Sequence, residues 1–189
     1  MDAIVIAGQS NAEGLAPHLR ALVPHVAVRE FAFGGYSLLK EAAMPGAPAE
    51  YWLNEQVISQ VCVQVTLADV NVTAVWWIQG ETEALNGTTT EAYSDGLYDL
   101  RQRMLAQFGM FDMIVSPIGA IDPKYRFARP VLAAQYRCHE RGMILGPEYW
   151  DLLAEPDTIH LTDEGRRAFA RRFADFIAGR FRFRPFGAR

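Results

Sequence analysis

Apolar runs separated by amphipathic stretches divide the chain into alternating strands and helices. Residues 3–7 are apolar without alternation, which is typical of a strand buried on both faces of a parallel sheet. Three further strands are predicted over 25–33, 72–78 and 111–115, and a fifth lies within 143–153. Each strand is followed by a loop of turn-forming or polar residues.

Helices with one apolar face are predicted between these strands. A short and irregular helical stretch over 15–23 is broken by Pro17 and Pro24. Longer helices are predicted over 53–65, 90–108 and 130–141, and Thr162 caps a final one. Residues 36–50 and 79–90 read as loops, the first rich in proline and glycine and the second polar.

Alternating strands and helices favour an α/β fold with a parallel sheet covered on both faces. We expect a three-layer, flavodoxin-like domain with five strands in the order 2-1-3-4-5. The domain is predicted to span residues 1–180, and residues 181–189 form a basic, aromatic tail.

The composition is that of an ordinary globular protein, with 50% hydrophobic residues and a net charge of −4. This balance argues against a nucleic-acid partner, which requires a clustered basic surface. The sequence shows neither a membrane-spanning apolar run nor a signal peptide. We therefore expect a cytoplasmic enzyme, a part of a phage particle or a domain of a larger chain. Cys62 and Cys138 fall on predicted helices and read as small core residues.

Candidate chemistry begins at Ser10, which follows the first strand in the stretch Gly8-Gln9-Ser10-Asn11. Ligands of open α/β sheets lie just outside the carboxyl ends of the strands. In the predicted strand order, Gly35 and the stretch Gln79-Gly80-Glu81 come to the same edge. Ser10 at this edge is a candidate nucleophile if a base is available.

His160 is the histidine best placed to be that base, because it lies in a carboxyl-edge loop three residues after Asp157. A Ser-His-Asp relay needs such a carboxylate to orient the imidazole. The backbone N–H groups of Ser10 and Gly35 and the side-chain amide of Gln79 could bind an oxyanion. The pattern lacks the Gly-x-Ser-x-Gly elbow of α/β-hydrolases and the Lys-Ser/Thr of a phosphate loop. A flavin-binding site at this edge is still an alternative, because it needs only hydroxyls and backbone amides at a helix N-terminus.

Four blocks give the sequence a resemblance to the SGNH hydrolases, and among them to the carbohydrate esterases that include sialate O-acetylesterases and acetylxylan esterases. The blocks are Gly8-Gln9-Ser10-Asn11, residues 34–38, Trp77-Ile78-Gln79-Gly80-Glu81 and Asp157-Thr158-Ile159-His160. They occur in the order found in the family. At the position of Ile78, these esterases often have His.

The resemblance implies a serine esterase that removes acetyl or another short acyl group from a carbohydrate hydroxyl. Ser10 would be the nucleophile, His160 the base and Asp157 its partner, with Ser10, Gly35 and Gln79 at the oxyanion. Gln9, Asn11, Gly80 and Glu81 would support them. We expect Glu81 to anchor backbone amides and hold Gln79. The alternative is that Glu81 itself acts as a second carboxylate near His160.

Aromatic residues in and after the 36–50 loop are candidates for the walls of a substrate cleft: Tyr36, Tyr51 and Trp52. For Trp52, packing in the core is an equal expectation. The expected partner is an acylated carbohydrate, and we expect no metal and no cofactor. A non-catalytic binding module and a lipase or thioesterase of the same fold remain alternatives. The sequence leaves the oligomeric state open.

Overall fold

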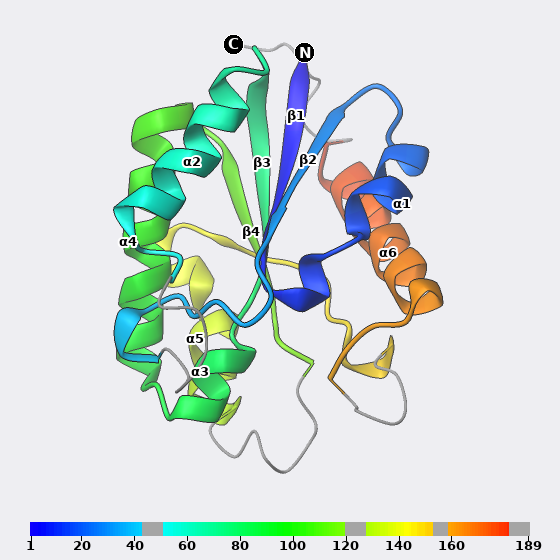
Figure 1. Ribbon diagram of the computed structural model, residues 1–189. Coiled ribbons are helices and arrows are strands. Elements are labelled where there is room, and N and C mark those ends of the chain that lie inside the picture. The colour runs from blue at the N-terminus through cyan, green and yellow to red at the C-terminus, as the bar shows by residue number, and fades with distance from the viewer. Residues whose placement is uncertain (43–50, 120–127, 153–158, 182–189) are drawn as a thin grey trace.

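The computed structural model describes residues 1–42, 51–119, 128–152 and 159–181, which form three layers (Figure 1). The central sheet is parallel, with strand order β2-β1-β3-β4-β5. Its strands are β1 (Asp2–Gly8), β2 (Ala27–Ala32), β3 (Asn71–Ile78), β4 (Asp112–Ser116) and β5 (Ile144–Leu145). This confirms the predicted fold class and strand order.

Helices cover both faces of the sheet (Figure 1). One face carries α2 (Glu55–Thr66), α3 (Glu81–Asn86), α4 (Thr90–Phe108) and α5 (Ala128–Tyr136). The other face carries α1 (Leu15–Leu22) and α6 (Asp163–Phe181), which pack against each other. Within the described ranges, none of these helices is long and apolar enough to cross a membrane.

The core lies on both sides of β3, because neighbouring side chains of a strand point to opposite faces. Trp77 packs edge-on against Trp52 on the α2 side, with 5.0 Å between ring centroids. Trp76 stacks on Phe173 of α6 at 3.9 Å. Trp76 and Trp77 are both completely buried, so they belong to the core.

Two predicted segments differ from the structure. The stretch after Ser10 is a regular helix, α1, because Pro17 lies in its first turn, where the backbone N–H has no partner within the helix. The predicted polar loop after Gln79 contains the short helix α3. Its first turn holds buried acidic residues, so it lacks the apolar stripe that marks a helix in the sequence.

The carboxyl ends of β1, β2 and β3 meet at one edge of the sheet. In the strand register, Gly8 lies beside Ala32 on one side and Ile78 on the other. A Cβ on Gly8 would lie 1.9 Å from the Ile78 carbonyl oxygen, and its φ of 153° also favours glycine. Because glycine at position 8 lets the ends of β1 and β3 approach this closely, the loops that follow these strands start side by side.

Candidate active site

Ser10 and His160 lie within hydrogen-bond distance at this edge. Ser10 begins a single 3₁₀ turn, Ser10–Ala12, directly after β1, and His160 lies shortly before α6. His160 Nε2 is 3.1 Å from Ser10 Oγ, although 150 positions separate the two residues in the sequence. The Ser10 side chain is partly exposed and His160 is exposed, so both are accessible from solvent.

Asp157, the predicted partner of His160, lies outside the described residues. Its place in a relay with His160 therefore stays a prediction.

Asn11 joins the nucleophile turn to the histidine loop. Its Nδ2 donates to the Ile159 carbonyl oxygen at 2.8 Å, and its Oδ1 accepts from the Leu161 N–H at 3.0 Å. These two backbone groups flank His160 on either side. Asn11 is buried, so the side chain that directly follows Ser10 links the backbone on both sides of His160 to the nucleophile turn.

Glu81 contacts the Asn11 side chain and helps to hold it in place. Its Oε1 accepts hydrogen bonds from Asn11 Nδ2 at 2.9 Å and from the Tyr149 hydroxyl at 2.7 Å. Burial raises the pKa of Tyr149 well above its ordinary value, as does the nearby Glu81 charge, so Tyr149 remains a proton donor. Glu81 thus binds side-chain donors, and the expectation that it anchors backbone amides and holds Gln79 is wrong.

Glu83, two residues further on, performs that role. Its carboxylate accepts from the backbone N–H groups of Leu38 and Leu39 and from Gln79 Nε2. Glu83 is absent from the residues predicted by sequence, because its segment reads as a loop there. The signal that could have identified it is a second acidic residue, two positions after Glu81, in the segment that follows β3.

Thr82 links the loops that carry the other predicted site residues. Its hydroxyl donates to the Gly35 carbonyl oxygen at 3.3 Å and accepts from Gln9 Nε2. Gln9 Oε1 in turn accepts from the Gly80 N–H at 3.0 Å. Gln9 and Gly80 therefore tie the loop after β1 to the loop after β3.

The three predicted oxyanion donors differ in their surroundings. Gly35 is exposed and has a φ of 77°, a conformation that favours glycine. Neither its N–H nor that of Ser10 donates to a backbone acceptor within the described part of the chain. Gln79 is completely buried, and its Nε2 donates to Glu83 and, at 3.4 Å, to the Tyr36 carbonyl oxygen.

Burial raises the pKa of Glu83 from 4.5 to about 7, although its N–H donors act in the opposite direction. The carboxyl is completely buried, and among the described residues no Lys, Arg or His forms an ion pair with it. Ionised Glu83 is therefore held by N–H groups alone.

Because the folded state keeps the Glu83 proton more tightly than the unfolded chain, Glu83 makes stability depend on pH. Its contribution is complete below pH 4.5 and is lost as the pH rises to about 7. The loss amounts to about 3 kcal/mol at 1.36 kcal/mol per pKa unit. Urea unfolding between pH 4.5 and 8 should show this fall in the wild type but not in Glu83→Gln. An equal fall in both would contradict the prediction.

The aromatic wall candidates divide into two groups. Tyr36 and Tyr51 are partly exposed, and Tyr36 stacks on Phe33 with 5.0 Å between the ring centroids. Trp52 is completely buried, and its indole N–H donates to the Gly8 carbonyl oxygen at 3.2 Å. Trp52 is thus a core residue that anchors the end of β1, and it does not line an open cleft. Ile78 is also completely buried.

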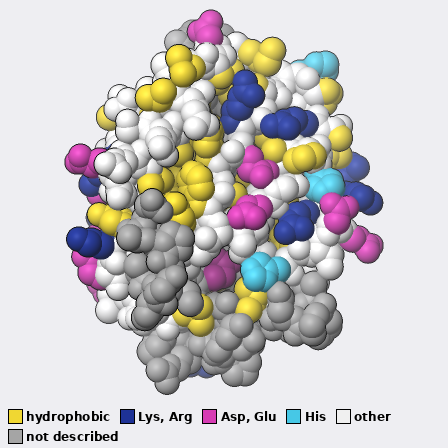
Figure 2. Space-filling model, in the orientation of Figure 1, with side chains coloured by type: hydrophobic (Ala, Val, Ile, Leu, Met, Phe, Trp, Pro, Cys, Tyr) yellow, Lys and Arg dark blue, Asp and Glu magenta, His cyan; other side chains and the backbone are white. Residues whose placement is uncertain are grey.

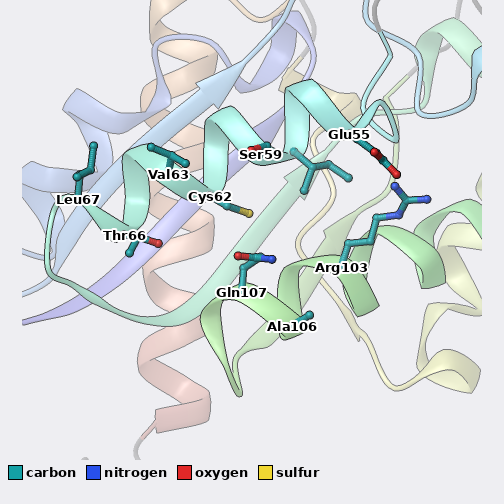
Figure 3. Close-up of a pocket in the computed structure, with 10 residues that line it drawn as sticks. Glu55, Ser59, Cys62, Val63, Thr66, Leu67, Arg103, Ala106 and Gln107 are labelled. Carbon is teal, nitrogen blue, oxygen red and sulfur yellow. The ribbon is translucent and has the colours of Figure 1, made fainter.

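A groove of about 580 Å³ lies between α2 and α4, away from the strand ends (Figure 3). It is lined by Cys62, Ser59 and Arg103 among others. Burial raises the pKa of Cys62 to about 11, which disfavours the reactive thiolate. Arg103 pairs with Asp99, and the residues that line the groove include no histidine that could act as a base.

On the face shown in Figure 2, acidic, basic and histidine side chains are interspersed rather than gathered by sign. Among the described residues, no three His, Cys, Asp or Glu side chains gather as ligands for a metal ion.

A family model for "Carbohydrate esterase, sialic acid-specific acetylesterase" matches residues 26–178. The chain belongs to this carbohydrate esterase family. The match contains Gly35, Gln79 and His160, and Ser10 lies before its start. This match confirms the resemblance to the carbohydrate esterases that the four sequence blocks indicate. No curated protein sequence matches the chain.

Solved structures of esterases share the fold of this family member. A carbohydrate acetylesterase from Sinorhizobium meliloti has a TM-score of 0.71 at 14% identity, covering 96% of this chain and 100% of that chain. A carbohydrate esterase family 3 protein from Talaromyces cellulolyticus has a TM-score of 0.71 at 12% identity, and the match covers 97% of this chain and 99% of that chain. An inhibitor-bound aryl esterase from M. smegmatis has a TM-score of 0.71 at 11% identity, and the match covers 95% of this chain and 99% of that chain.

Proposed function

We propose that this carbohydrate esterase family member is a serine esterase that removes acetyl or another short acyl group from a carbohydrate hydroxyl. The observation that carries the proposal is the 3.1 Å separation of Ser10 Oγ and His160 Nε2. A hydroxyl is a weak nucleophile unless an adjacent base takes its proton, and this distance allows the transfer.

In the proposed reaction, Ser10 Oγ attacks the ester carbonyl carbon while His160 Nε2 accepts the hydroxyl proton. The tetrahedral intermediate collapses when the C–O bond to the sugar breaks, and His160 returns the proton to the leaving sugar oxygen. Water, deprotonated by His160, then attacks the acyl-enzyme and releases the carboxylic acid and free Ser10. Asp157 would orient His160 and stabilise its protonated form.

The N–H groups of Ser10 and Gly35 would bind the oxyanion from the open side of the site. Gln79 would join them when the N–H that donates to Tyr36 over 3.4 Å turns to the substrate oxygen. Such a long bond is weak, so exchange for a charged acceptor is favourable.

The carbohydrate part of the proposal draws on the family match and on the esterases of the same fold. Tyr36 and Tyr51 would provide aromatic surface for a sugar next to the Gly35 loop. Because Ser10 and His160 are accessible from solvent, a bulky alcohol could approach them.

A fluorophosphonate probe followed by peptide mass spectrometry tests the nucleophile directly. We expect the label on Ser10, with none on the exposed Ser59, and hydrolysis of acetylated sugars and short aryl esters. An unlabelled Ser10 would favour the non-catalytic binding module. Faster hydrolysis of long-chain esters than of acetyl esters would favour a lipase or thioesterase.

A further inference from the structure

Glu83 lies beneath the proposed oxyanion site and has no part in the proposed chemical steps. It is completely buried on the first turn of α3, a place where a carboxylate is costly unless it serves its neighbours. Its partners come from two loops of the site: Gln79 follows β3, and Leu38 and Leu39 come shortly after Gly35.

The Gln79 amide is held at both ends. Nε2 donates to Glu83 Oε2, and Oε1 lies 3.0 Å from the Tyr93 hydroxyl. Burial raises the pKa of Tyr93 well above its ordinary value, as does the Glu83 charge, so Tyr93 keeps its proton. A phenol can donate or accept, so Tyr93 alone would tolerate either orientation of the amide.

Above its pKa of about 7, ionised Glu83 therefore selects one orientation together with the Tyr36 carbonyl oxygen, because both groups accept hydrogen bonds and cannot donate them. With Nε2 turned toward Glu83, the second N–H of Gln79 points to the Tyr36 carbonyl, one residue after Gly35. With the amide reversed, an oxygen would face this loop and repel a developing oxyanion.

We infer that Glu83 is a positioning residue that keeps the N–H end of the Gln79 amide turned toward the Gly35 loop, ready for the oxyanion. The inference rests on the proposed function, in which Gln79 is an oxyanion donor.

Glu83→Gln tests it with almost no change in shape. The new amide can accept from Leu38 with its oxygen, but its NH₂ then faces Gln79 Nε2. Gln79 relieves this clash by turning over, with its NH₂ directed at the Tyr93 oxygen. Above pH 7, where wild-type Glu83 is ionised, we expect kcat for p-nitrophenyl acetate to fall about 10²-fold, as misplacement of a catalytic group does, with little change in KM.

A double-variant cycle separates this role from a purely structural one. Gln79→Ala should lower kcat by about 10²–10³-fold. Adding Glu83→Gln to Gln79→Ala should lower it no more than about 2-fold further, since the amide is already gone. Asn86→Ala is the matched control, because Asn86 lies on the same helix and bonds Ala42 instead. Its kcat should stay at the wild-type value.

Wild-type kcat in Glu83→Gln, or an equal loss with and without Gln79, would overturn the inference. If Ser10→Ala is inactive in the same assay, the proposed function stands in either case. Should Glu83→Gln fail to fold, Glu83→Asp replaces it in the cycle. Its shorter carboxylate cannot reach Gln79 and Leu38 together, so the same pattern of losses is expected.

Discussion

Ser10→Ala should fold normally and lose essentially all esterase activity. Removal of the nucleophile from a serine hydrolase lowers kcat on the order of 10⁶-fold, because the remaining groups cannot form the acyl-enzyme. The fold should be unaffected, since the Ser10 hydroxyl is partly exposed and, among the described residues, its one hydrogen-bond partner is His160. Turnover of p-nitrophenyl acetate and thermal unfolding, measured on the same sample, check both expectations.

Ser59→Ala is the control for this loss. Ser59 is an exposed serine of α2 in the groove of Figure 3, and its replacement should leave activity unchanged. Activity retained in Ser10→Ala would remove Ser10 from the mechanism and make the Ser10-His160 contact a structural one.

Asn11→Ala should lower both stability and activity. The substitution leaves the buried Ile159 carbonyl and Leu161 N–H without their side-chain partner. An unsatisfied buried group such as the Leu161 N–H costs about 1–3 kcal/mol, and the hydrogen bond to Ile159 is lost as well. His160 also loses the connection that holds its loop beside Ser10, and kcat should fall about 10²-fold. Urea unfolding and steady-state kinetics measure the two effects.

Asn11→Asp distinguishes positioning from packing. Aspartate fills the same space and still accepts from Leu161, but its second oxygen faces the Glu81 carboxylate and the Ile159 carbonyl. We expect it to lose activity as Asn11→Ala does. Near-wild-type kcat in Asn11→Asp would show that Asn11 does not position His160. Asn71→Asp is a suitable control, because Asn71 bonds Asp2 at the surface, far along β3 from the site.

The residues at the strand ends were largely predictable from the sequence. Buried apolar runs identify β1 and β3, and helices between them require a parallel sheet, so Ser10, Gly35 and Gln79 could be assigned to one edge. The fold was accessible in this way, and the family was accessible through the resemblance of the four sequence blocks. Trp52 and Ile78 show the limit, because exposure depends on neighbours from distant parts of the chain. Trp52 is a wall candidate in the sequence and Ile78 stands where related esterases often have His, yet both are completely buried.

The sequence by itself determined the sheet, its strand order and the residue types at its carboxyl edge, because each follows from local periodicity and chain connectivity. Only the tertiary structure decided which of those residues touch. It placed His160 beside Ser10 through Asn11, and it assigned the amide-anchoring role to Glu83 in place of Glu81. The physical reason is that a hydrogen bond depends on a distance below about 3.5 Å and on direction. A shift of two positions along α3 turns a side chain by about 200°, so one carboxylate meets Gln79 and the other meets Asn11 and Tyr149.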